Sequence, residues 1–188
     1  MLRGEIRIAG SGGQGIILGS KIIAEAAGIY EGYNVVQTQI YGAAARGELA
    51  KADVIIDDGD IYTLEISAAN ILCCLSQEAY DVYRKETREK GLIIIDDFYV
   101  TKYDQLNPRY LAFPISRKAI EISGSELVTN IIAVGIITVL GSYFSEESAR
   151  KAVESKVPKG FVDMNIKALE AGFEMAKKKR PGLCDIDA

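Results

Sequence analysis

The sequence predicts an α/β fold with one doubly wound, mainly parallel sheet, helices on both faces and a helical C-terminal part. Three observations support this prediction. Short apolar segments alternate with longer segments of helical periodicity, as in a parallel sheet whose strands are joined by helices. Beyond Pro114 the pattern is helical, and the length of 188 residues suits one domain. We place this domain at residues 1–179 and expect residues 180–188 to form a frayed tail.

Six segments are predicted as strands because each is short and rich in apolar or β-branched residues. The segment 92–96, Leu-Ile-Ile-Ile-Asp, is the clearest, since a continuous apolar run is typical of a central parallel strand buried on both faces. The predicted strands cover residues 3–9, 34–39, 52–57, 70–75, 92–96 and 110–113.

Six further segments are predicted as helices, and most have a start or stop signal. Gly32 follows the first helix as a C-terminal signal, and Ser145 and Pro158 are placed to open the last two. The segment 127–140 is apolar nearly all round, so we expect it to be buried. The predicted helices cover residues 16–30, 77–90, 116–123, 127–140, a segment after Ser145, and a last one from Pro158 to residue 179.

The composition excludes several classes of function. A net charge of -4, from 22 Lys+Arg against 26 Asp+Glu, argues against a nucleic-acid partner. No segment approaches the roughly 20 apolar residues of a membrane span, and residues 1–5 lack the apolar run of a signal peptide. We therefore expect a cytoplasmic protein with neither a nucleic-acid nor a membrane partner.

The chain is poor in the side chains that carry most catalysis. It has no histidine, so no Ser–His or Cys–His nucleophile pair can form within it, and histidine metal ligands are excluded. Its three cysteines are too few for an iron–sulfur cluster, which usually takes four thiolates. Cys73 and Cys74 lie in an apolar run and are expected to be buried structural thiols. We assign no catalytic or metal-binding residue and expect the chain not to catalyse a reaction alone.

A glycine-rich turn follows the first predicted strand. Gly10, Gly12 and Gly15 have the G-x-G-x-x-G spacing that lets a backbone approach a phosphate at a helix N-terminus. A dinucleotide fold also places a carboxylate after its second strand, but residues 36–39 are Val-Gln-Thr-Gln. This departure disfavours NAD and favours a structural turn, or a turn that contacts a ligand shared with another chain.

A second small-residue segment runs from Tyr41 to Gly47, with the sequence Tyr-Gly-Ala-Ala-Ala-Arg-Gly. It is expected to leave the carboxyl end of the second strand, which is the edge where open α/β sheets bind ligands. Arg46 could form a bidentate contact with a carboxylate or phosphate. An ordinary surface loop with Arg46 in a salt bridge is an equally good interpretation.

Taken together, these two segments and several others resemble the gamma subunit of 2-oxoacid:ferredoxin oxidoreductases. The matching stretches are residues 10–15, residues 37–42 with Arg46 and Gly47, residues 76–80, Asn130, and Asn165 with Ala168 and Gly172. They occur in the family's order and cover nearly the whole chain. Gln37-Thr38-Gln39 is closest to the 2-oxoglutarate branch, although the pyruvate and branched-chain (2-ketoisovalerate) enzymes share much of the pattern. The family commonly has a second glycine where this chain has Glu48.

The resemblance implies a complex whose other subunits carry thiamine diphosphate and iron–sulfur clusters. Such a complex oxidatively decarboxylates a 2-oxo acid, forms acyl-CoA and carbon dioxide, and reduces ferredoxin, with the cofactor performing the difficult chemistry. The implied partners are alpha and beta subunits, with a delta subunit left open, and ferredoxin through the complex. This chain itself would hold no cofactor, and coenzyme A would be a co-substrate.

The resemblance also implies which residues contact a cofactor or coenzyme A. They are Gly12, Gly13, Gln14, Gly15, Tyr41, Gly42, Arg46 and Asn130. For Asn130 we weigh a contact with a neighbour against capping of the buried helix, and we prefer capping. Two other functions stay open: a stand-alone nucleotide- or flavin-binding Rossmann-like module, and an interaction protein without a ligand. Tight nucleotide binding by the isolated chain would favour the first of these.

Overall fold

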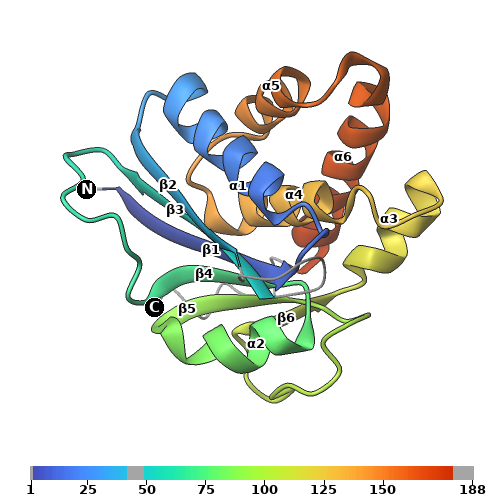
Figure 1. Ribbon diagram of the computed structural model, residues 1–188, viewed down its shortest axis with the longest axis horizontal. Helices are drawn as coiled ribbons and strands as arrows, with labels where there is room; N and C mark the ends of the chain where they lie inside the picture. Colours follow the sequence, from blue (N-terminus) through green and yellow to red (C-terminus); the bar gives the residue numbers. More distant parts are fainter. Residues whose placement is uncertain (1, 42–48, 180–188) are drawn as a thin grey trace.

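A computed structural model of the chain describes residues 2–41 and 49–179. Its centre is a six-stranded sheet in the order β2-β3-β1-β4-β5-β6 (Figure 1). The strands are β1 (Arg3–Ser11), β2 (Asn34–Tyr41), β3 (Leu49–Asp57), β4 (Ala69–Cys74), β5 (Thr87–Asp96) and β6 (Tyr110–Phe113). No helix in the described residues is long and apolar enough to cross a membrane.

Six α-helices and three short helical turns join and cover these strands. The α-helices are α1 (Ile16–Glu25), α2 (Gln77–Tyr83), α3 (Ile115–Ser123), α4 (Thr129–Gly141), α5 (Glu146–Lys156) and α6 (Val162–Lys179). The short turns are a π-helix η1 (Ala26–Tyr30) and the 3-10 helices η2 (Arg84–Glu86) and η3 (Lys159–Phe161).

The sheet is mainly parallel, as predicted. β1 pairs parallel with β4, β4 with β5, and β5 with β6. β3 is the exception, because it pairs antiparallel with both β1 and β2. β2 and β3 therefore form an antiparallel pair on the outer side of β1, and β2 runs in the same direction as β1.

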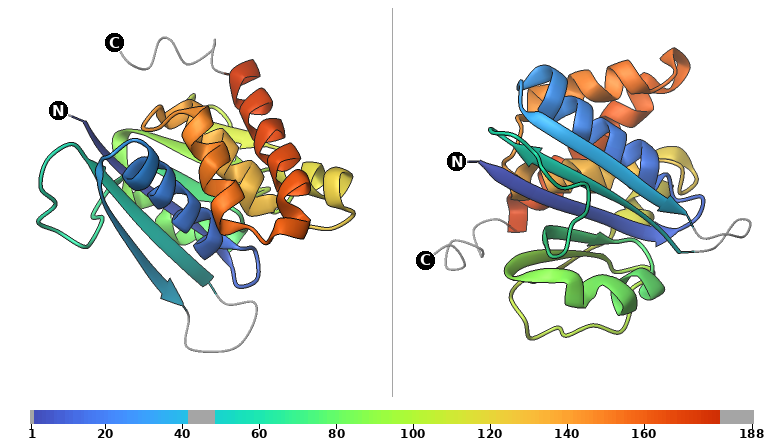
Figure 2. Two further views of the ribbon diagram at one scale, coloured as in Figure 1. Left: turned by 90° about the horizontal axis from the view of Figure 1, so that it is seen from above. Right: turned by 60° about the vertical axis from the view of Figure 1, so that its left-hand side comes forward.

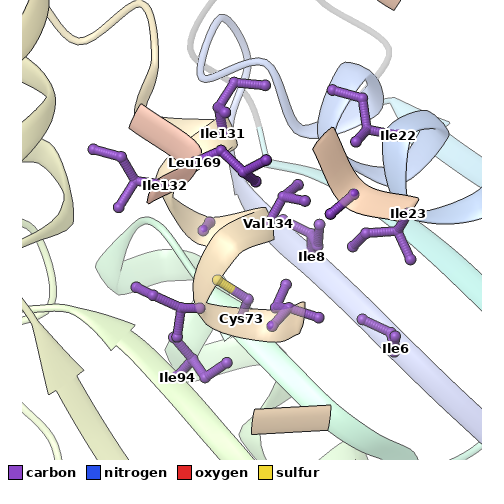
Figure 3. Packing of buried hydrophobic residues seen from close by; sticks show 14 of the residues in the cluster. Ile6, Ile8, Ile22, Ile23, Cys73, Ile94, Ile131, Ile132, Val134 and Leu169 are labelled. Carbon is purple, nitrogen blue, oxygen red and sulfur yellow. The ribbon is translucent and has the colours of Figure 1, made fainter. Parts of the chain in front are cut away.

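Helices cover both faces of the sheet, which confirms the predicted layers. α1, α4, α5 and α6 lie together on one face, and α2 lies on the other (Figure 1). The main core fills the space under the larger helical layer. Figure 3 shows Ile8 of β1, Cys73 of β4, Val134 of α4 and Leu169 of α6 gathered in this cluster.

α4 is buried on every side, in agreement with its apolar sequence. Every residue from Thr129 to Val139 is buried. Its closest neighbour is α6, and the two helices touch backbone to backbone at a pair of glycines. A Cβ on Gly135 would lie 2.4 Å from the Leu169 carbonyl oxygen, and one on Gly172 would lie 2.3 Å from the Ile132 carbonyl oxygen. Only glycine fits at these positions without moving one helix away from the other.

Two predicted helix boundaries were wrong. Residues 87–90 belong to β5 and not to the helix that begins at Gln77, which ends at Tyr83 and continues only as η2. Tertiary contacts override local helix propensity here, because Thr87 pairs with Ala69 and the Arg88 guanidinium bonds to Glu5. The last helix begins at Val162, since Pro158 opens the separate turn η3 first.

Charged side chains line the α2 face of β1. Arg7 is 1% exposed, and its guanidinium bonds to both carboxylate oxygens of Asp53 at 2.7 and 2.8 Å. Two residues away, Glu5 accepts hydrogen bonds from Arg3 and Arg88, each at 2.8 Å. Burial raises the pKa of Glu5, but the hydrogen bonds from Arg88 and Arg3 outweigh it and leave that pKa below the ordinary value of 4.5.

The glycine contact between α4 and α6 predicts a strong effect of one methyl group. We expect Gly172→Ala to lower the free energy of unfolding by about 1–2 kcal/mol, because overpacking exceeds the gain in helix propensity. Gly160→Ala is the matched control, since nothing lies within 4 Å of a Cβ at Gly160. Urea unfolding of both variants measures the difference; equal midpoints would contradict the close contact.

The ion pairs of Glu5 predict a pH dependence of stability. Because the folded-state pKa of Glu5 is lowered, its ion pairs stabilise the protein fully above the unfolded pKa of 4.5. This contribution is lost as the pH falls further, through the folded-state pKa. The difference in melting temperature between wild type and Glu5→Gln should therefore be smaller in acid than at neutral pH. A difference in melting temperature that stayed constant over this pH range would show that the ion pairs of Glu5 do not make the stability depend on pH.

Candidate functional site

The glycine-rich turn lies at the carboxyl edge of the parallel strands. β1 ends at Ser11 and α1 begins at Ile16, so residues 12–15 form the connection between strand and helix. Open α/β sheets bind their ligands at this edge. Gly13 and Gly15 have φ angles of 103° and 71°, a region that favours glycine, so the turn needs its sequence to keep this shape.

Gln14 holds the turn closed from within. Its Oε1 accepts a hydrogen bond from the Ser11 N–H at 2.8 Å, and its Nε2 donates to the Leu75 carbonyl at 2.9 Å. Leu75 follows β4, so this one side chain joins the turn after β1 to the end of the neighbouring strand. The functional groups of Gln14 are thus occupied by the protein itself, and the residue positions the turn.

Asn130 supports the turn from the other side. It is 2% exposed, and its Nδ2 donates to the Gly15 carbonyl at 3.1 Å. A Cβ on Gly15 would lie 2.6 Å from that nitrogen, so only glycine leaves room for the contact. Our preferred capping role for Asn130 was wrong. The N-cap of α4 is Val128, without a side-chain cap, and Asn130 lies inside the helix.

The site retains unused hydrogen-bonding capacity. The Oδ1 atom of Asn130 is buried and has no hydrogen-bond partner within the described part of the chain. The first turn of α1 contains no acidic residue and its N-cap makes no side-chain hydrogen bond, so the positive end of the helix is not neutralised locally. Above Gly13 the space is open, since nothing lies within 4 Å of a Cβ placed there. Backbone N–H groups and a positive helix end together suit an anion or another polar ligand.

The structure brings Tyr41 to the same edge, but it does not describe the whole second segment. In the sheet register, Tyr41 of β2 and Gly10 of β1 both pair with Ala50 of β3. Their backbones therefore lie level and two strand spacings apart, roughly 10 Å. Gly42 and Arg46 lie outside the described residues, while Gly12 lies in the exposed part of the first turn.

The arrangement differs from a dinucleotide-binding site. In such a site the second strand lies beside the first, whereas here β3 separates β2 from β1. The side chain of Gln37, a polar group that could stand in for the missing carboxylate, instead donates to the Ser20 hydroxyl of α1 at 3.1 Å. β2 itself contains no acidic residue that could hold a ribose.

One buried acidic residue at the same edge, Asp96, was not among the site residues predicted from the sequence. Asp96 ends β5, is fully buried, and accepts a 2.5 Å hydrogen bond from the Ser116 hydroxyl at the start of α3. Burial raises the pKa of Asp96, and the hydrogen bonds from Ser116 offset only part of that effect. Its position directly after the Leu-Ile-Ile-Ile run was a usable signal, because the carboxyl ends of parallel strands form the edge where open α/β sheets bind ligands.

The thiols do not contribute to this site. Cys73 and Cys74 are both fully buried in β4, as predicted, and burial raises the pKa of each thiol. Within residues 2–41 and 49–179, no group of three or more His, Cys, Asp or Glu side chains could hold a metal ion.

Comparison with known proteins identifies the family. A family model described as pyruvate ferredoxin/flavodoxin oxidoreductase matches residues 5–175, which is most of the chain. The chain therefore belongs to this family.

Two relatives match along nearly their whole length. The 2-oxoglutarate synthase subunit KorC of Methanocaldococcus jannaschii is 39% identical over 179 residues, covering 94% of this chain and 96% of KorC. The gamma subunit of keto/oxoacid ferredoxin oxidoreductase from Geobacter sulfurreducens has a TM-score of 0.84 and 42% identity, covering 95% of this chain and 99% of that chain. The 2-oxoglutarate:ferredoxin oxidoreductase of Magnetococcus marinus shares the fold, with a TM-score of 0.82 at 23% identity over 95% of this chain and 32% of that chain.

The bridging role of Gln14 predicts a loss of stability when it is shortened. Gln14→Ala removes two hydrogen bonds and leaves the Leu75 carbonyl without this donor, so we expect a loss of about 2 kcal/mol in the free energy of unfolding. Gln105→Ala, at an exposed loop position, should change it by less than about 0.5 kcal/mol. If urea unfolding gave the same midpoint for both variants, Gln14 would not hold the turn.

Proposed function

We propose that this chain is a gamma-type subunit, without a cluster of its own, of a 2-oxoacid:ferredoxin oxidoreductase complex. The complex would convert a 2-oxo acid, coenzyme A and oxidised ferredoxin into acyl-CoA, carbon dioxide and reduced ferredoxin. 2-Oxoglutarate is the favoured substrate. The observation that carries the proposal is the full-length match to KorC, a 2-oxoglutarate synthase subunit, over 94% of this chain.

The cofactors of the reaction belong, on this proposal, to the partner subunits. Thiamine diphosphate supplies the carbanion chemistry and iron–sulfur clusters carry the electrons. The scarcity of thiolate ligands for a cluster agrees with that division, because the two cysteines that the structure describes are buried in the core. Alpha and beta subunits are the expected partners, with ferredoxin reached through the complex.

The proposed contribution of this chain is to help bind coenzyme A where the subunits meet. Coenzyme A carries phosphates and amide groups. The N-terminus of α1 suits the phosphates, and the unpaired Asn130 oxygen could accept a hydrogen bond from an amide N–H. Gly12, Gly13 and Gly15 would provide the backbone surface, and Tyr41, Gly42 and Arg46 would approach from the neighbouring segment. Gln14 would keep the turn in shape.

Reconstitution of the complex tests the proposal directly. Partner subunits assembled with this chain should reduce ferredoxin when given 2-oxoglutarate and coenzyme A, and activity should fall at least tenfold when the chain is omitted. The isolated chain should show neither activity nor tight nucleotide binding. Full turnover by the partners alone would contradict the proposal, and faster turnover of pyruvate than of 2-oxoglutarate would contradict the substrate.

The loop assignment has its own test. We expect Arg46→Ala to raise the KM for coenzyme A, or to weaken assembly, by roughly tenfold, because a charge-assisted contact contributes about 1.5–3 kcal/mol. Arg84→Ala, on the α2 side of the sheet, is the matched control and should leave both unchanged. If Arg46→Ala also left assembly and coenzyme A affinity unchanged, this loop would not form part of the site.

A further inference from the structure

The outer side of β2 is an open edge of the sheet. β2 pairs with β3 along its whole length, from Asn34 opposite Asp57 to Tyr41 opposite Ala50. Within the described residues, no strand pairs with its other side, and Figure 2 shows β2 outermost, with no helix lying beyond it. Alternate backbone N–H and C=O groups along this eight-residue strand are therefore available to another chain.

β2 lacks the features that usually protect an edge strand. Its sequence, Asn-Val-Val-Gln-Thr-Gln-Ile-Tyr, contains no charged residue, no proline and no glycine. Its pairing with β3 shows no register shift, so no bulge twists the edge away. Ile40 is 58% exposed on this strand, and Ile29, in the adjoining turn η1, is 74% exposed. This strand is long, regular and uncharged.

The opposite edge of the same sheet is protected. β6 has only four residues, from Tyr110 to Phe113. Lys179, at the end of α6, places its ammonium group over the Phe113 ring and donates a hydrogen bond to the Ala112 carbonyl. One edge is thus short and bears a lysine, whereas the other has no such protection. The difference makes β2 the edge at which another strand can be added.

We propose that β2 pairs antiparallel with β2 of a second copy of this chain, about a two-fold axis at Thr38. This register keeps each face of the sheet continuous across the two copies, because every residue meets one of the same parity. Thr38 lies opposite the partner's Thr38, Val36 opposite the partner's Ile40, and Gln37 opposite the partner's Gln39. Two sheets of six strands would then join into one of twelve.

Self-complementarity is the reason to choose a second copy as the occupant. Threonine with threonine and β-branched with β-branched are favourable cross-strand pairs, and no like charges meet along the strand. This proposal stands on the strand itself and does not depend on the proposed function.

Disulfide trapping tests the register. In a full-length Cys184→Ser background, Thr38→Cys should form a covalent dimer on mild oxidation, because directly opposed residues lie about 4.5–5.5 Å apart. Val36→Cys is the matched control, on the same face and the same strand. Its two copies would lie four residues apart along the strands, roughly 13 Å, which is too far for a disulfide. Cys73 and Cys74 are fully buried and should not react.

Sedimentation of the full chain tests whether the dimer exists without the disulfide. Wild type should show a concentration-dependent dimer, and Thr38→Lys should lose it, because two lysines would face each other across the axis. Within one copy, Thr38 pairs with Asp53 of β3, so a lysine introduced there would lie opposite a carboxylate and the variant should still fold. Leu106→Lys adds the same charge on an exposed loop and should keep the dimer.

The proposal would be overturned by a wild-type chain that stays monomeric at all concentrations, by no disulfide at position 38, or by equal trapping at positions 36 and 38. Slow amide exchange of β2 only in a complex with other subunits would also overturn it, since a different chain would then cover the edge.

Discussion

The close approach of α4 and α6 is the constraint on which the larger helical layer depends. Gly135 and Gly172 let the two backbones touch, so that α4 fits between the sheet and α6. Because α4 is buried on all sides, it cannot shift toward solvent, and its position determines where its side chains lie. At its first turn, α4 carries Asn130 to the Gly15 carbonyl, so the packing of the core determines the shape of the glycine turn.

The turn is therefore held from both sides before any ligand or partner arrives. Gln14 ties it to the end of β4, and Asn130 ties it to α4. Preorganisation of this kind lowers the entropic cost of binding, because the backbone groups need not be ordered by the ligand. The chain itself supplies a turn of fixed shape, and the relatives that it resembles are subunits of oxidoreductases.

Much of the fold was predictable because the strongest signals in the sequence are local. Three features that depend only on neighbouring residues were placed correctly. They are the apolar strand at residues 92–96, the glycine turn and the Ser145 cap. The direction of β3 was not predictable, since an apolar strand does not reveal which neighbour it pairs with. The strand at residues 87–90 makes contacts with distant parts of the sequence, because Thr87 pairs with Ala69 and Arg88 forms an ion pair with Glu5. The partner of Asn130 is 115 residues away, and no local pattern indicates it.

Native-state amide hydrogen exchange measures most directly whether the core holds the turn in place. The Ser11 N–H bonds to the Gln14 side chain, and the Gly19 N–H bonds to the Gly15 carbonyl. If packing against α4 holds the turn, both amides should exchange about as slowly as those in the middle of α4, such as Ile136, and open only with the core. Exchange as fast as in the exposed loop at residues 58–65 would show that the turn is not preorganised and takes its shape from a partner.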